Sequence, residues 1–239
     1  MSKQGAGGQE RRERKERSHA TSQPVEHRDG PARLRAQFLL ETLAALAIGV
    51  AFLGLPSELT VGPNWLALAI SAAVLLPLLT TAFVHPLNHE VARMLRAGLQ
   101  ILLTAALLSS VGLLVTHLGD ANLQSAIGAG GLLRAGALLW VSNILIFSVW
   151  YWELDGDGPV HRHQRGHPAT DFLFPQQATG RPFAPGFVDY LFLAFGFATA
   201  LSPADTAPLT RRAKLLMMAE AIISISIIAL VVGRSVNII

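Results

Sequence analysis

The chain has 239 residues, of which 51% are hydrophobic and 15% are charged, and its formal net charge is +3. Several apolar runs of about 20 residues exclude an ordinary soluble domain and predict a helical membrane protein, because helices satisfy their own backbone hydrogen bonds in lipid. The sequence contains no cysteine, which excludes disulfides, thiolate metal sites and cysteine nucleophiles. The basic charge lies mostly in the N-terminal tail, and we expect no nucleic-acid partner.

Residues 1–36 form a polar segment in which basic and acidic residues alternate, as in the run QERRERKERSH. Its low hydrophobicity predicts a disordered, basic cytoplasmic tail. The basic residues either contact anionic lipid headgroups or act only as a topology signal. The first apolar run begins only at Phe38, so we expect an uncleaved first helix rather than a signal peptide.

Residues 37–153 are predicted to form a four-helix transmembrane region. The expected helices cover approximately residues 36–55, 65–84, 91–118 and 132–152. The tail and the turn after the second helix are basic, whereas the loops after the first and third helices contain no Lys or Arg. The positive-inside rule therefore places the N-terminus in the cytoplasm.

Two features of these helices bear on what lies inside the bundle. Glu41, near the start of the first helix, either lies among lipid headgroups or faces the bundle and needs a partner. The fourth helix ends in Trp150-Tyr151-Trp152, which is typical of an aromatic belt at the membrane surface.

Residues 154–186 are rich in Gly, Pro and His, which argues against regular structure. This loop contains His161, His163 and His167 together with several carboxylates, a set of side chains that could bind a divalent metal such as zinc. The spacing matches no established ligand motif, and the alternative is a solvated loop at the membrane surface. We expect no cofactor.

The C-terminal segment, residues 187–239, contains a short apolar run, a polar turn and a long apolar helix. The short run, residues 188–201, would rise about 21 Å as a helix, against about 30 Å of hydrocarbon. It is therefore predicted to be a re-entrant or half-length helix. The last apolar run, residues 214–239, is long enough to cross the bilayer, and Thr210 is the predicted N-cap of its helix.

Residues 189–239 resemble the pore module of potassium-channel-type proteins, in which a pore helix, a filter loop and an inner helix follow one another. The pattern of that family runs roughly DALYFSFVTLTTVGYGD, followed by a proline, a threonine and a charged helix start. Asp189 and Asp205 are sixteen positions apart, as are the two aspartates of the pattern. The other matching residues are Leu191, Phe195, Thr199, Pro208, Thr210, Arg212 and Glu220.

The filter itself differs from the family pattern, because TVGYG is replaced by Ala200-Leu201-Ser202-Pro203-Ala204. A potassium filter aims backbone carbonyls at a bare ion, and its glycines adopt angles that these residues disfavour. Potassium selectivity is therefore not expected. The resemblance implies the arrangement of the module and, because four such modules surround one axis, a homo-oligomer. The same tail and the aromatic segment before it also resemble an uncharacterised family of bacterial inner-membrane proteins, which implies a location but no activity.

Two groups of candidate site residues follow. The pore-loop candidates are Thr199, Ser202, Pro203, Asp205 and Thr206, and the intramembrane polar candidates are Asn143, Glu220 and Ser224. Asn143 either bonds to a neighbouring helix or faces a polar path. Glu220 is either a functional ionisable group or is neutralised by Arg212 or Lys214. Asp205 either contacts an ion or bonds within its own turn.

The predicted fold is an all-α polytopic bundle of five membrane-spanning helices and one short helix, in a bacterial inner membrane. The first functional hypothesis is a pore-loop-like ion channel or permease. The second is a non-conducting accessory or scaffold protein, and the third is a metal-dependent membrane enzyme that uses the histidine loop. The chain carries none of the common motifs of soluble hydrolases or phosphate loops, so we expect no enzyme.

Overall fold

The computed structural model describes residues 31–84, 89–116, 121–180, 183–199 and 205–236. Residues 36–239 form one unit, and the description below concerns that unit. Most of the predicted tail lies outside the described residues. Its last part does not, because the first helix already begins at Pro31. A proline is well placed there, since the first turn of a helix leaves its backbone N–H groups without intrahelical partners.

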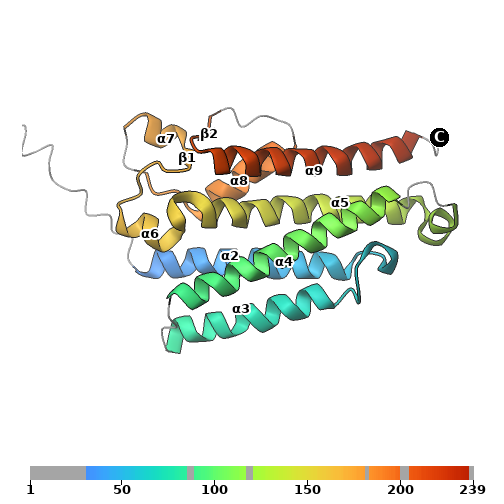
Figure 1. The fold of residues 1–239 in the computed structure, drawn as a ribbon, viewed down its shortest axis with the longest axis horizontal. Coiled ribbons are helices and arrows are strands. Elements are labelled where there is room, and N and C mark those ends of the chain that lie inside the picture. The colour runs from blue at the N-terminus through green and yellow to red at the C-terminus, as the bar shows by residue number, and fades with distance from the viewer. Residues whose placement is uncertain (1–30, 85–88, 117–120, 181–182, 200–204, 237–239) are drawn as a thin grey trace, which may run out of the picture. The chain divides into compact units, whose positions relative to one another are not determined.

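The described residues form a bundle of long helices (Figure 1). These helices are α2 (Pro31–Leu53), α3 (Leu66–Val84), α4 (His89–Thr116), α5 (Ala121–Leu154) and α9 (Arg211–Val236). Among the residues that the structure describes, four stretches are long and apolar enough to cross a membrane: Ala36–Leu53, Glu90–Thr116, Gly130–Asp157 and Arg211–Gly233. The apolar stretch found in α3, Leu66–Leu76, is shorter, so the count of five spans stays a prediction.

Helix α5 is the central element of the bundle. It packs against α4, α8 and α9, and α4 in turn packs against α3. Gly128 interrupts its first turns with a positive φ of 68°, so the regular helix runs through the apolar part that follows. The bundle is therefore organised around one helix that touches most of the others.

The aromatic end of α5 lies inside the bundle rather than at a lipid surface. Tyr151 and Trp152 are 0% and 1% exposed. Successive residues of a helix point about 100° apart, so three consecutive side chains reach three directions. The ring N–H of Trp150 donates to Thr104 of α4 (2.9 Å), the phenol of Tyr151 donates to the carboxyl of Glu220 in α9, and the ring N–H of Trp152 donates to Glu41 of α2 (3.3 Å). The prediction of an aromatic belt at the membrane surface is therefore wrong, because these three side chains form hydrogen bonds to neighbouring helices.

The segment after α5 is regular, contrary to the expectation of an irregular loop. It contains η3 (Asp155–Asp157), α6 (Pro159–Gln164), β1 (Phe172–Leu173) and α7 (Pro175–Ala178). Strand β1 pairs antiparallel with β2 (Ala207–Pro208), with Phe172 opposite Pro208. This pairing fixes the chain that leads into α9 at the C-terminal end of α5, which we call the loop end. The opposite end carries η1 (Ser57–Leu59).

Helix α8 (Phe187–Ala198) has 12 residues and lies against α5 and α9. Its N-terminus is at the loop end, where Phe187 and Tyr190 make edge contacts with the ring of Trp152 at 6.1 and 5.5 Å. Its C-terminus lies away from the loop end, beside the middle of α5, where the carbonyl of Ala198 accepts a hydrogen bond from Trp140 (3.2 Å). Trp140 and Trp152 are separated by about 18 Å along α5.

The two flanks of the turn after α8 therefore lie at different depths. Ala198 is deep in the bundle, whereas Ala207 in β2 is paired with Leu173 at the loop end. The chain enters and leaves at the same end, as expected for a half-length, re-entrant helix. Asp189 caps the start of α8 by accepting the backbone N–H of Gly186 (2.7 Å).

Gly49 provides a test of how closely α2 and α3 pack. A Cβ atom at this position would lie 2.7 Å from the Cα atom of Leu68, so the backbone of α3 would have to move. We expect Gly49→Ala to lower the free energy of unfolding by about 1–3 kcal/mol, a typical cost of overpacking. Thermal unfolding in detergent measures the effect.

The matched control is Gly98→Ala in α4, where an added Cβ atom has no neighbour within 4 Å. Alanine favours a helix over glycine by about 1 kcal/mol, so this variant should be as stable as the parent or more stable. Equal stability of the Gly49→Ala and Gly98→Ala variants would contradict the close approach of α2 and α3.

Candidate functional site

The three intramembrane candidates from the sequence lie where α5 and α9 pack together, and one of them, Ser224, also contacts the C-terminal end of α8. Asn143 comes from α5, and Glu220 and Ser224 come from α9, and all three side chains are buried. The hydroxyl of Ser224 donates to the carbonyl of Ala198 (2.5 Å), and the amide of Asn143 donates to the backbone carbonyl of Glu220 (3.3 Å). The cluster therefore joins α5, α8 and α9 through side chains that sequence analysis had singled out. We call Ser142, Asn143, Tyr151, Glu220 and Ser224 the deep cluster.

Glu220 is fully buried and is hydrogen-bonded by the phenol of Tyr151. Arg212, which the sequence offered as a neutralising partner, instead binds Asp171 and Asp157. The carboxyl group of Glu220 is thus held by an uncharged donor inside the bundle and not by Arg212. Tyr151 was not predicted for this role, because its sequence context suggested a membrane-surface residue.

Three buried oxygen atoms of the deep cluster have no hydrogen-bond partner among the described residues. They are Oε1 of Glu220, Oδ1 of Asn143 and Oγ of Ser142. A buried polar atom without a partner costs about 1–3 kcal/mol, so such atoms point to a bound water, ion or proton. All three oxygens can accept a hydrogen bond, and the C-terminus of α8 adds partial negative charge nearby. The chemistry of the cluster therefore suits a proton or a small cation.

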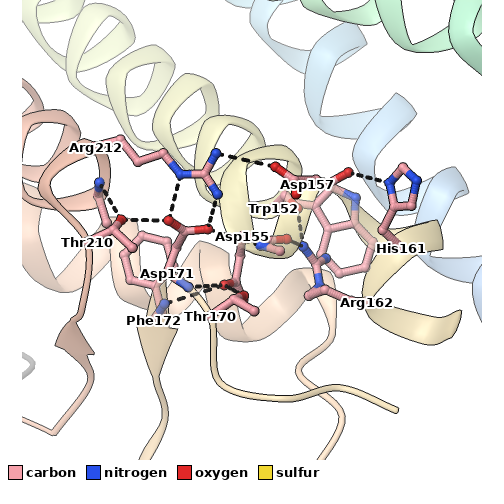
Figure 2. A network of polar contacts seen from close by, with 12 residues as sticks. Trp152, Asp155, Asp157, His161, Arg162, Thr170, Asp171, Phe172, Thr210 and Arg212 are labelled. Carbon is pink, nitrogen blue, oxygen red and sulfur yellow. Dashed lines mark hydrogen bonds and ion pairs between the residues drawn. The ribbon is translucent and has the colours of Figure 1, made fainter. Parts of the chain in front are cut away.

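A second polar network lies at the loop end and involves Asp171 (Figure 2). This buried carboxylate accepts two hydrogen bonds from the guanidinium of Arg212, both 2.7 Å long. It also accepts the hydroxyl of Thr210 (2.6 Å) and the backbone N–H of Gly156 (3.1 Å). Thr210 caps α9 as predicted, with its Oγ1 accepting the N–H of Ala213 (3.3 Å). The basic start of α9, which opposes the helix dipole, is thus held by a carboxylate from the preceding loop.

Asp155 is the second carboxylate that accepts hydrogen bonds in this network. Its carboxylate accepts hydrogen bonds from the hydroxyls of Thr170 and Tyr190 (both 2.6 Å) and from the backbone N–H of Asp171 (2.9 Å). The adjacent Gly156 has a φ of 58°, which favours glycine, and it turns its N–H toward Asp171. The network therefore links the end of α5 to α8 and α9.

Arg162 of α6 is a buried cation beneath this network. Its Nη1 donates to the backbone carbonyls of Trp152 (2.6 Å) and Asp155. The guanidinium lies 4.5 Å from the ring centroid of Trp152 and 5.1 Å from that of Tyr190, which are favourable cation–π distances. Nothing in the local sequence of Arg162 distinguishes it from an exposed arginine, so its role was not predicted.

The histidines of the loop do not converge. Nδ1 of His161 lies 3.0 Å from the carbonyl oxygen of Asp157, and the rings of His163 and His167 meet edge to face with centroids 5.6 Å apart. Within the described ranges, no group of three or more His, Cys, Asp or Glu side chains is placed to hold a metal ion.

The pore-loop candidates are only partly described. Thr199 ends α8, and its hydroxyl donates to the carbonyl of Phe195 (2.9 Å). Asp205 is exposed and Thr206 is half-buried. Ser202 and Pro203 lie outside the described residues.

No family model, no curated protein and no solved structure matches the chain. The site must therefore be interpreted from its own geometry.

Asp171 gives a prediction for the pH dependence of stability. Burial raises the pKa of this carboxyl, but hydrogen bonds from Arg212, Thr210 and the N–H of Gly156 outweigh it and hold the pKa below its usual value. A carboxyl with a lowered pKa stabilises the fold fully above its unfolded-state pKa of about 4, and this contribution is lost as the pH falls through the folded-state pKa. We expect Asp171→Asn to cost about 1–3 kcal/mol at neutral pH.

Thermal unfolding of the parent and of Asp171→Asn, followed from neutral pH to below about pH 4, measures this effect. The difference in unfolding temperature between the parent and Asp171→Asn should become smaller as the pH falls below about 4. The matched control is Asp157→Asn, which removes a half-exposed ion pair with Arg212 and should cost less than about 1 kcal/mol. If the difference in unfolding temperature between the parent and Asp171→Asn did not change with pH, this would contradict the ion pair between Asp171 and Arg212.

Proposed function

We propose that the chain is an integral protein of a bacterial inner membrane whose α8–α9 module binds and moves a proton or small cation, as a pore-loop-like channel or permease. The observation that carries this proposal is the position of Glu220. Its carboxyl group is fully buried, and one oxygen of it has no partner among the described residues. One turn further along α9, Ser224 donates to the last carbonyl of the half-length helix α8.

Two physical arguments support a transport role. An ionisable group within a membrane span is costly, and such groups commonly mark ion or proton pathways. Half-helices that end inside a membrane protein place backbone carbonyls and the negative end of the helix dipole at cation sites. Helix α9 carries both features one turn apart, because Glu220 is its buried carboxyl group and Ser224 binds the last carbonyl of α8, that of Ala198.

The resemblance to a pore module supports the same proposal. In that family a short helix packs between an outer and an inner helix, and here α8 packs against α5 and α9. Ser224, which donates to the end of α8, belongs to the helix that corresponds to the inner helix. Because the glycines of the potassium filter are missing, the proposed selectivity is not for potassium.

The proposed orientation places the loop end in the cytoplasm. Basic residues gather there, including Arg93, Arg96, Arg162, Arg165 and Arg212, whereas the loop 56–64 at the opposite end contains none. Helix α8 would then enter from the cytoplasmic side. The proposed assembly is a homo-oligomer, and the apolar face of α9 that the fold leaves exposed, at Leu215, Met218, Ile222, Ile225 and Val232, is available to lipid or to a second copy.

A non-conducting accessory or scaffold protein is the alternative. The observation that favours it is that Asn143, Ser224 and Glu220 each make a hydrogen bond within the chain. Polar side chains in membrane bundles often serve only to tie helices together in this way. Measurement of flux separates the two functions.

The test is cation and proton flux into liposomes that contain the purified protein. We expect the parent to conduct and Glu220→Gln to reduce the flux at least about tenfold, because the variant removes the only carboxylate of the deep cluster. Asp205→Ala, at the pore-loop flank, tests the contribution of the turn. The control is Glu58→Gln, an exposed carboxylate in η1 at the opposite end, which should leave the flux unchanged.

Flux that is absent from the parent and from every variant would reject the transport function and favour the accessory protein. Flux that survives Glu220→Gln undiminished would reject the deep cluster as its pathway.

A further inference from the structure

Two further carboxyl groups lie at the loop end: Glu41 of α2 is buried, and Glu153 of α5 is half-buried. Glu41 of α2 is 4% exposed and accepts the ring N–H of Trp152 (3.3 Å). Glu153 of α5 forms an ion pair with Arg96 of α4, with Nη1 and Oε1 3.2 Å apart. The guanidinium of Arg96 also lies 4.8 Å from the ring centroid of Phe38, one turn before Glu41 on α2. Three helices thus place two carboxyl groups and one guanidinium together.

The charges of this cluster balance only when it holds one proton. Two ionised carboxylates beside one arginine would leave a net negative charge in the bundle, and burying such a charge is expensive. A hydrogen bond between two carboxyl groups also requires a proton, because a carboxylate can only accept. Arg96 compensates Glu153, so the bound proton compensates Glu41.

The cluster has access to water. A cavity of about 120 Å³ opens beside it, and Arg96 and Glu153 form part of the wall. The other charged or titratable residues of the wall are Glu90, Arg93, Asp157 and His161. Glu41 is not part of the wall, so a proton that reaches it from this cavity does so by way of Glu153.

The other nearby charges are engaged with their own partners. Arg93 pairs with Glu90 (2.9 Å), and Asp157 lies 3.3 Å from Arg212 and 3.9 Å from Arg165. Arg162 is stacked on the ring of Trp152 and binds backbone carbonyls. Arg96 is therefore the cation of this cluster: it pairs with Glu153 of α5 and stacks on Phe38, which lies on the same helix as Glu41.

We propose that Glu41, Glu153 and Arg96 form a binding site for one exchangeable proton, filled from the cavity at the loop end. The proton passes from a hydronium ion in the cavity to a carboxylate oxygen of Glu153 and is shared with Glu41. One O–H bond of the hydronium ion breaks, one O–H bond forms on the carboxyl group, and a water molecule is left. When it leaves, two like charges face each other between α2 and α5. The pH of the aqueous phase therefore affects how closely α2 and α5 pack. The site is separate from the deep cluster and does not depend on the proposed transport function.

The test is infrared difference spectroscopy of the full chain in lipid nanodiscs, which detects the C=O stretch of a protonated carboxylic acid. The parent for this experiment is Glu220→Gln, so that the deep cluster contributes no acid band. We expect one acid band at neutral pH that is lost on adding either Glu41→Gln or Glu153→Gln, because the carboxylate that remains pairs with Arg96 and ionises. Glu58→Gln, far from the site, is the control and should keep the band.

A second variant tests the role of the arginine and keeps both carboxyl groups. Arg96→Gln removes the positive charge, so the proton should be held more tightly and the acid band should persist to a pH higher by at least about one unit. Elution as a single folded species shows that each variant is intact. Absence of an acid band at neutral pH, a band that both glutamine variants retain, or an unchanged pH dependence in Arg96→Gln would overturn the proposal.

Discussion

The fold depends on one constraint: polar groups that are buried in an apolar bundle must find partners within it. Helix α5 meets this constraint for most of its neighbours. Its aromatic end carries an apolar body and a polar tip at three successive positions, and the helical rotation directs these tips to α4, α9 and α2. The same residues that fill the core therefore also fix which helix lies on which side of α5.

The half-length helix is positioned by the same constraint at both of its ends. Its last carbonyl accepts hydrogen bonds from Trp140 and Ser224, so the end of α8 is anchored to α5 and α9 together. At the loop end, the aromatic contacts of Trp152 and the network of Asp155 and Asp171 hold its start and the return of the chain. An element too short to span a membrane thus has a defined depth, which places its C-terminus between Trp140 of α5 and Ser224 of α9.

The helices of the fold could be predicted from the sequence because apolar length and turn chemistry are local properties. The short run before the polar turn indicated a half-length helix, and Thr210 was correctly predicted as the cap of α9. The pairing of side chains could not be predicted in this way. Tyr151 and Glu220 are 69 positions apart, and periodicity along one helix does not say which other helix it faces.

Some residues of the candidate site could accordingly be named from the sequence, but the contacts between them could not be predicted. Asn143, Glu220 and Ser224 were predicted as polar groups in apolar segments. Asp155 and Asp171 were considered only as possible metal ligands beside the histidines, and Arg162 looked like an ordinary loop residue. Their burial arises from folding of a Gly- and Pro-rich segment that has no long helix or strand of its own. The loop histidines drew attention because of their chemistry, but the fold uses the carboxylates beside them to secure the start of α9.

The most direct test of the account is the side from which the turn after α8 can be labelled. The chain has no cysteine of its own, so single cysteines can be introduced at Asp205, at Gln176 in α7 and at Val61 at the opposite end. In sealed vesicles, a membrane-impermeant thiol reagent should label the cysteines at 205 and 176 from the same side and the cysteine at 61 from the other. Labelling of position 205 from the side of position 61 would show that the short helix crosses the membrane, and would contradict the account.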